Sequence, residues 1–329
     1  MSNISGSGGR SLIYVHGRDF KPAADTLFDL VITAVSAGMD RDNHDRVDEL
    51  RLINKTIAYY GDVSNKLLDN RGRAYDEQLD VGDRRNALKL LCDLARRKDF
   101  GVSCYDRLPG KTAIAEFVAD VTAPLLGSIG LFGALVSKVA PDVAEYWNKK
   151  DSSYRDSVLG RVREAIRAGL DRDDHIMLIS HGSGCIAAYD ALWQLSHDEK
   201  WAAEYAEKKI DSWLTLGSPL GDTTVRKRLL GASSKNRERF PCNVVSWHNI
   251  SAEDDYLCHD NTCADDFKPM LKQRQISSIR DYRIYNLAVR YGKSNPHSSL
   301  GYLVHPRTCS IIAEWLSKTA TEPTRQSSL

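Results

Sequence analysis

The residues best placed to do chemistry lie in one stretch, Ile176 to Leu192, where an apolar run is followed by a tight turn and a series of small residues. A strand, sharp turn and helix in this order lift one residue above the edge of a sheet. The strain of the turn requires small residues two positions before and after the lifted one. With position 182 as the lifted residue, these flanks are Ser180 and Gly184, and both are small.

The neighbouring serine fits the same turn less well. If Ser183 were the lifted residue, its flanks would be His181 and Cys185, and a histidine side chain is too large for the first flank. The pattern therefore places Gly182 at the position where a serine nucleophile is expected. Such a serine attacks acyl carbonyl groups when a histidine takes its proton.

The elements that must position this turn alternate along the chain. Six short apolar runs, several of them stopped by Gly or Pro, predict strands that are buried on both faces of a parallel sheet. They cover residues 12–15, 56–60, 176–179, 213–216, 244–247 and 282–287. Helical spacing of apolar residues predicts helices after Pro22 and over residues 154–170, 184–196 and 311–316. This alternation predicts one doubly wound α/β domain.

The turn sequence Ser-His-Gly-Ser-Gly at residues 180–184 resembles the Gly-His-Ser-x-Gly of the α/β-hydrolase superfamily, in its lipase- and esterase-like branch. His181 and Gly184 match, Ser180 is a tolerated small residue, and Gly182 departs from the pattern. The resemblance implies a single domain over residues 11–318, with a mostly parallel sheet of about six strands flanked by helices. Residues 1–10 and 319–329 are expected to be disordered tails.

By the same resemblance, backbone amides form an oxyanion hole. The first predicted strand ends in His16-Gly17, and in this family the following loop supplies one donor, here the N–H of Arg18 or Asp19. The N–H of Ser183, directly after the lifted residue, is the second donor.

The resemblance also implies a carboxylate and a histidine, which follow the lifted residue in that chain order. Asp255 is the expected acid because Tyr256 and Leu257 follow it and can pack back on the core, with Asp254 as the alternative. His297 is the expected general base, in the loop after the last strand. His305 is its alternative, although His305-Pro306 is typical of the start of the final helix.

Glycine at position 182 has three explanations: an engineered replacement of serine, a natural pseudoenzyme, or a shifted turn that uses Ser183. We favour the first because the rest of the machinery is present. The expected function is a serine hydrolase of carboxylic ester or acyl substrates, lipids included, inactivated in this chain and without a cofactor. The alternative is a pseudohydrolase that binds a ligand or a protein without turnover.

Two segments stand outside the alternation. Residues 40–49 are predicted to be a charged connector. Residues 121–140 form an apolar stretch that contains Pro124 and three glycines, within a helical insertion at about 105–150. We interpret it as a helical pair packed on the core, and the alternative is a mobile lid over a lipid-like substrate.

Composition excludes several classes of protein. The formal charge is +1, from 45 basic and 44 acidic residues, which gives no electrostatic support for nucleic-acid binding. No apolar run reaches the length of a transmembrane helix, although peripheral membrane contact stays possible. Seven scattered cysteines are typical of reduced thiols in a cytoplasmic protein.

Other ligand classes have weak support. Cys258 and Cys263 lack the second pair of ligands that a structural zinc site needs, and the acidic residues around Asp255 lack the regular spacing of a calcium loop. The basic residues between Arg226 and Arg239 are interpreted as a solvated loop, with a phosphate-bearing substrate as the alternative.

Overall fold

The computed structural model describes residues 9–42, 44–97, 100–110, 140–258 and 262–318. Within them, six strands form one sheet in the order β2-β1-β3-β4-β5-β6, and every neighbouring pair is parallel. The strands are β1 (Arg10–Val15), β2 (Asn54–Ala58), β3 (His175–His181), β4 (Ile210–Leu216), β5 (Val244–Ala252) and β6 (Ser278–Ile284). The predicted single α/β fold is therefore confirmed.

The inner strands are buried on both faces, as their apolar runs predicted. In β1, Ile13 packs into one hydrophobic cluster and Leu12 into the other, on the opposite side of the sheet. In β3, Leu178 and Met177 divide in the same way. Successive side chains of a strand point to opposite faces, so each inner strand ties two separate cores together.

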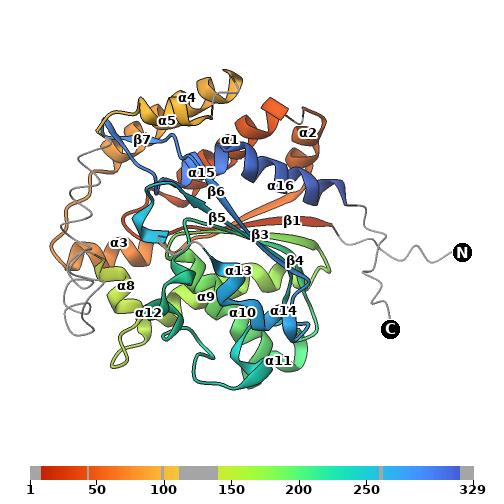
Figure 1. Ribbon diagram of the computed structural model, residues 1–329. Coiled ribbons are helices and arrows are strands. Elements are labelled where there is room, and N and C mark those ends of the chain that lie inside the picture. Colours follow the sequence, from red (N-terminus) through yellow and green to blue (C-terminus); the bar gives the residue numbers. More distant parts are fainter. Residues whose placement is uncertain (1–8, 43, 98–99, 111–139, 259–261, 319–329) are drawn as a thin grey trace, which may run out of the picture.

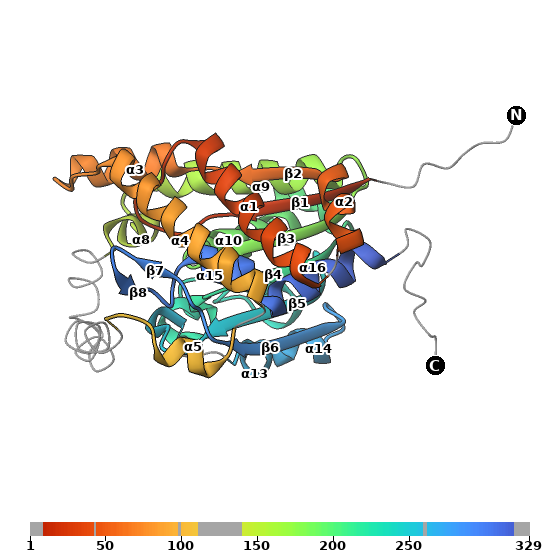
Figure 2. The same cartoon turned by 90° about the horizontal axis from the view of Figure 1, so that it is seen from above.

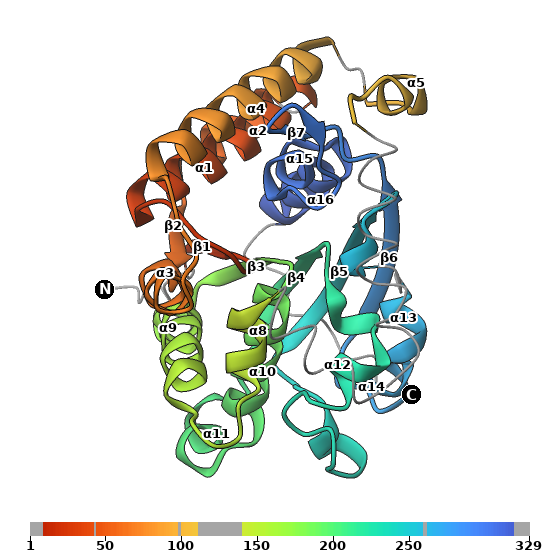
Figure 3. The ribbon, with the colours of Figure 1, turned by 90° about the vertical axis from the view of Figure 1, so that its left-hand side faces the viewer.

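Helices cover both faces of the sheet (Figures 1 and 3). One layer holds α1 (Ala24–Asp42), α2 (His44–Leu52), α4 (Glu77–Arg97), α15 (Ser299–Val304) and α16 (Pro306–Ser317). The other is built around α9 (Ser153–Leu170) and α10 (Gly184–His197), with α3 (Gly61–Asn70), α8 (Pro141–Tyr146) and α11 (Glu199–Tyr205) beside them. The remaining described α-helices are short: α5 (Val102–Asp106), α12 (Thr223–Arg226), α13 (Cys263–Asp266) and α14 (Lys268–Lys272).

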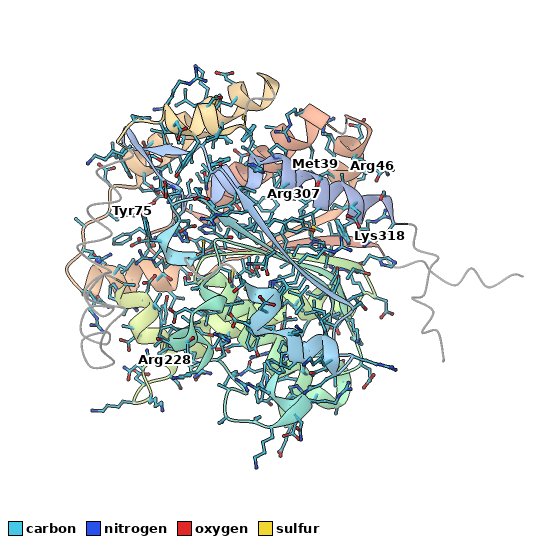
Figure 4. All side chains as sticks on the ribbon, in the orientation of Figure 1. Met39, Arg46, Tyr75, Arg228, Arg307 and Lys318 are labelled. Atoms are coloured by element: carbon cyan, nitrogen blue, oxygen red, sulfur yellow. The ribbon has the colours of Figure 1, made fainter. Side chains whose placement is uncertain are left out.

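The sheet reverses its direction of winding at β1. From β1 the chain goes to β2 on one side, and later elements continue through β3 on the other side. In open α/β sheets, ligand sites form at the carboxyl ends of the strands where the order reverses. Those ends lie on the side of the molecule that Figure 2 shows with α3, α8 and β7, away from both chain termini. In Figure 4 the labelled Tyr75 lies at this end and Lys318 at the opposite end.

Some local predictions need correction. Residues 40–49 were predicted to be a connector, but residues 40–42 belong to the end of α1 and residues 44–49 belong to α2. Val47 and Leu50 are buried on the inner face of α2, so a helix with two apolar anchors replaces the expected loop. The strand β1 begins at Arg10, inside the predicted tail of residues 1–10. Of the predicted insertion, α5 and α8 are described, whereas residues 111–139, with nearly all of the apolar stretch 121–140, lie outside the described residues.

A small hairpin leads into the loop that carries His297. Its strands β7 (Val289–Arg290) and β8 (Lys293–Ser294) pair antiparallel. Arg290 anchors the hairpin to α4: its guanidinium lies 2.6 Å from Asp80 Oδ1 and also contacts Asp83. All three side chains are largely buried, so the hairpin has a fixed position on the helix.

Candidate active site

The turn after β3 has the shape that the small residues predicted. Gly182 has φ +54, and its N–H donates to the carbonyl of Leu216 at the end of β4 (2.9 Å). The backbone passes so close to the end of β1 that a Cβ at Gly184 would collide with the carbonyl of His16. A side chain at Gly17 would likewise lie 3.0 Å from the ring of His181. Glycine at 17 and 184 therefore allows two strand ends to meet.

Asp255 and His297 form a pair beside this turn. Nδ1 of His297 lies 2.9 Å from Oδ2 and 3.0 Å from Oδ1 of Asp255. The Asp255 side chain is almost completely buried, whereas 22% of the His297 side chain is exposed. An unprotonated carboxylate can only accept, so Nδ1 carries the proton and Nε2 presents its lone pair outward.

The outward nitrogen of His297 faces position 182. A Cβ built on Gly182 would lie 2.9 Å from His297 Nε2, and its next neighbours are Cε1 of the same ring and Cα of Gly17. A side chain at this position would therefore point at the base of the pair. The structure thus brings together three of the sequence-predicted positions, 182, 255 and 297, which are contributed by the ends of β3 and β5 and by the loop before α15.

Tyr302, which the sequence analysis did not single out, holds the acid. This buried residue of α15 donates its hydroxyl to Asp255 Oδ2 (2.6 Å) and accepts the N–H of Ala252 (2.8 Å). Burial raises the pKa of Tyr302 well above its ordinary value, so the hydroxyl stays protonated and remains a donor. The N–H of Leu257 donates to the other carboxylate oxygen (3.2 Å). The carboxylate is thus fixed from both sides.

Two side chains hold the carbonyls around His297. Asn286, fully buried, donates from Nδ2 to the carbonyls of Pro296 (2.8 Å) and Ser298 (2.9 Å). Nε2 of His181 lies 2.9 Å from the carbonyl of His297 itself and must be the donor there. Burial lowers the pKa of His181 well below its ordinary value, so the ring stays neutral with its proton on Nε2. Three consecutive carbonyls are therefore positioned by side chains.

Gly217, at the end of β4, allows the pair to sit against the sheet. It has φ +55, and an added Cβ would lie 2.9 Å from Asp255 Oδ2 and 3.1 Å from His297 Nδ1. The sequence Gly217-Ser218-Pro219 follows β4 directly. Its glycine is required by both the backbone conformation and the close approach of the pair.

His16 orients the loop that follows β1. Its Nε2 accepts the N–H of Tyr60 (3.1 Å), so its Nδ1 carries the proton and donates to the carbonyl of Gly17 (2.9 Å). Burial lowers the pKa of His16 to about 3, which preserves this tautomer. Because the C=O and N–H of a trans peptide point in opposite directions, holding the Gly17 carbonyl turns the N–H of Arg18 away from His16.

Lys21 fixes the rest of this loop. Its buried ammonium donates to the carbonyls of Arg18, Asp19 (3.0 Å) and Phe20 (3.2 Å). Burial lowers the pKa of Lys21 to about 7, and the nearby Arg84 contributes to this lowering. The sequence carried no signal for this role, because a lysine after a strand is usually a surface residue.

The two predicted loop donors differ in the structure. The N–H of Asp19 donates to Oδ2 of Asp142, the buried acidic residue of α8, at 2.9 Å. Arg18 instead lines a partly open cavity together with Ser183, Asp142 and Tyr60. Of the two loop residues, Arg18 is therefore the better candidate for an oxyanion donor. For the N–H of Ser183, the structure records no acceptor among the described residues.

The same cavity has an apolar wall. It is formed by α8, α9 and α10 and consists of Val143, Tyr146, Tyr154, Val158, Ile186 and Ala187. The tyrosine hydroxyls are already engaged, since Tyr146 donates to Asp190 and Tyr154 pairs with Ser64. The cavity therefore presents hydrocarbon and ring faces beside the turn at 182.

The alternative acid and base lie elsewhere. Asp254 has φ +58 and its carboxylate accepts the hydroxyl of Tyr105, so it faces away from His297. His305 caps α16, as its Pro306 neighbour suggested, and Nδ1 of its ring accepts the N–H of Arg307 (3.1 Å). Ser183 lines the cavity, and the described contacts include no hydrogen bond between it and His297.

The structure also describes the other candidate ligand sites. In the described part of the chain, no group of three or more His, Cys, Asp and Glu side chains could hold a metal ion. No helix among these residues is long and apolar enough to cross a membrane. In the basic stretch, Arg226 pairs with Asp266 (2.6 Å) and Arg237 donates to the carbonyl of Gln273 (2.8 Å).

Comparison with known proteins adds no assignment: no family model, no curated protein and no solved structure matches this chain. The parallel six-stranded sheet with helices on both faces is compatible with the architecture of the α/β-hydrolase superfamily.

Proposed function

We propose that this chain carries an acyl-hydrolase site of the α/β-hydrolase type, related to lipases and esterases, with glycine at the nucleophile position. One observation carries the proposal. A side chain at position 182 would point at Nε2 of a histidine whose Nδ1 is bound by a buried aspartate. This is the arrangement that activates a serine toward carbonyl groups.

In a serine form, each group has a defined task. The substitution Gly182→Ser would introduce a hydroxyl whose oxygen attacks the acyl carbonyl carbon while His297 Nε2 takes its proton. Asp255 would hold the imidazole tautomer and stabilise the imidazolium. The N–H groups of Ser183 and Arg18 would bind the oxyanion, and water would then release the acyl group.

The expected ligands are small acyl compounds, carboxylic esters and lipid-like molecules among them. The apolar wall of the cavity supports this class, because it offers no charged group beyond Arg18 and Asp142. We also propose a cytoplasmic location. It is supported by the odd number and scattered spacing of the seven cysteines, which are typical of reduced thiols.

The test is covalent labelling of matched variants. Gly182→Ser requires the His297 ring to retreat by a few tenths of an ångström, which its partly exposed position allows. We expect a fluorophosphonate probe to label residue 182 of this variant, as mapped by mass spectrometry, and to leave the natural chain unlabelled. Gly182→Ser combined with His297→Gln is the control and should label far more slowly. A folded Gly182→Ser variant that stays unlabelled would contradict the proposal.

The second candidate function is a binding module that uses the same cleft without turnover. The absence of a hydroxyl at 182 favours it, as does the carboxylate of Asp142 on the N–H of Asp19. It predicts that Gly182→Ser remains unreactive. The shifted turn is tested in the same experiment, since it requires an adduct on Ser183 of the natural chain. Full probe reactivity after Ser183→Ala would exclude it.

A further inference from the structure

The outward ring nitrogen of His297, Nε2, is not engaged by the described part of the protein. Among the described residues, no side chain or backbone group forms a hydrogen bond with His297 Nε2. The opposite side of the same ring is held as firmly as a general base requires, by Asp255 at 2.9 Å. A partly exposed imidazole nitrogen that is oriented by a buried carboxylate has the geometry of a general base.

In the present position of the ring, the space in front of His297 Nε2 is open only because residue 182 is glycine. The 2.9 Å between His297 Nε2 and a Cβ at 182 is shorter than the contacts that real Cβ atoms make, so a serine side chain would require the ring to shift. Because glycine has no side chain, any nucleophile in this form of the chain has to come from solvent.

We infer that the glycine form is itself a hydrolase, in which the His297–Asp255 pair activates a water molecule directly. The inference rests on the site proposed above but requires no serine. It assigns to this chain a general-base reaction without an acyl-enzyme, on short acyl compounds that have good leaving groups, namely aryl esters and thioesters.

The reaction balances without a cofactor. His297 Nε2 takes a proton from water while the water oxygen forms a bond to the acyl carbon, and the carbonyl electron pair moves onto its oxygen. The N–H groups of Ser183 and Arg18 hold that oxyanion. The carbonyl then re-forms, the bond to the leaving group breaks, and the leaving oxygen or sulfur receives the proton from the imidazolium. The products are a carboxylic acid and an alcohol or thiol.

The substrate class follows from the lining of the cavity and from the rate enhancement that general-base catalysis provides. The partly open cavity beside Ser183 is bordered by the apolar side chains of Val143, Val158 and Ile186, so the acyl group of the proposed substrate would lie against hydrocarbon. General-base catalysis typically contributes about 10²- to 10⁴-fold. Without a covalent intermediate, this factor yields a useful rate only for acyl groups that already react readily with water.

The experiment measures kcat/KM of the natural chain for p-nitrophenyl acetate, with two variants beside it. His297→Gln removes the base and should lower kcat/KM about 100-fold. His175→Gln is the matched control, because His175 also pairs with an aspartate (Asp211, 3.1 Å) but lies at the amino end of β3. The control should leave the rate unchanged.

Three results would overturn the inference: equal rates for the natural chain and His297→Gln, an equal loss in His175→Gln, or an acetyl group on His297 by mass spectrometry. The last would show that the imidazole attacks the ester itself. Gly182→Ala provides a second route if His297→Gln does not fold, since its methyl group crowds Nε2 and should abolish the base-dependent rate. Fluorophosphonate labelling of Gly182→Ser is independent of these rates. Labelling there without a His297-dependent rate here would reject this inference and leave the proposed function standing.

Discussion

Gly217 offers the sharpest test of how the aspartate–histidine pair is packed. In the variant Gly217→Ala, the new methyl group would lie 2.9 Å from Asp255 Oδ2 and 3.1 Å from His297 Nδ1. Those two atoms are themselves 2.9 Å apart, so the methyl group presses on both ends of one hydrogen bond. Backbone atoms of the sheet fix Gly217, because its N–H donates to the carbonyl of Ile250 (2.9 Å). The pair must therefore move.

The cost has two parts. An L-residue with a left-handed backbone costs about 1–2 kcal/mol at φ +55. Losing a hydrogen bond to a buried carboxylate costs about 1.5–3 kcal/mol more. We expect Gly217→Ala to lower the free energy of unfolding by about 2.5–5 kcal/mol. Because the base is no longer held, the labelling rate of a Gly182→Ser background should fall about 10²-fold or more.

Gly72→Ala is the matched control. Gly72 also has a positive φ, +76, but a Cβ there meets nothing within 4 Å. This variant should lose only the backbone part, about 1–2 kcal/mol, and should keep its labelling rate. Urea unfolding and fluorophosphonate labelling of both variants in the Gly182→Ser background provide the two measurements. Equal destabilisation of the two variants, with labelling intact in both, would refute the packing of the pair against Gly217.

Three further predictions concern groups around the site and the core. Tyr302→Phe removes a hydrogen-bond donor from the buried carboxylate of Asp255 and should lower the free energy of unfolding in urea by about 2–4 kcal/mol. Tyr205→Phe is the control: its partner carboxylate, that of Asp171, is exposed, so the loss should be under about 1 kcal/mol. Lys21→Met should slow fluorophosphonate labelling of the Gly182→Ser variant about tenfold or more, because three loop carbonyls lose their hydrogen-bond donor. Lys55→Met is the control, since Lys55 also donates to three backbone carbonyls but lies far from the site, and it should leave the labelling rate unchanged. Burial raises the pKa of Asp190 from its ordinary 3.8 to about 6, so the folded state holds a proton that the unfolded chain releases, and stability falls as pH rises from about 4 to about 6. A pKa difference of about 2 corresponds to about 3 kcal/mol. Between pH 4 and pH 7.5, the stability of Asp190→Asn relative to the unchanged chain should therefore increase by up to that amount. Parallel pH profiles of the two proteins in urea unfolding would contradict this.

The sheet could be predicted from sequence because its signals are local. A continuous apolar run that ends in glycine, such as Leu12 to Gly17, is typical of a buried parallel strand, and the structure has a strand at each predicted place. Residues 40–49 were misjudged because their charges outnumber the apolar positions. Two buried residues, Val47 and Leu50, are enough to dock α2 once α1 and α16 provide a surface.

The positions of the turn at 182, Asp255 and His297 could also be proposed from sequence, because their signals are again local residue types and chain order. Small flanking residues identify the turn at 182, and chain order directs the search for Asp255 and His297. The supporting residues escaped notice because their roles depend on contacts between distant segments. Asn286 reaches two carbonyls on either side of His297, and Tyr302 reaches a carboxylate 47 positions earlier. No local pattern encodes such contacts.

The distribution of the site along the chain has a consequence for how the protein is made. The loop after β1 emerges early in synthesis, whereas His297 and the residues of α15 that hold its partner belong to the last tenth of the sequence. A ribosome-bound chain that ends before residue 297 already contains β1 to β6 and the turn at 182, but it has neither His297 nor Tyr302. If the proposed function is correct, reactivity is therefore withheld until His297 has been added and α15 has docked. A chain terminated anywhere before residue 297 would then lack the proposed general base even where its sheet has formed.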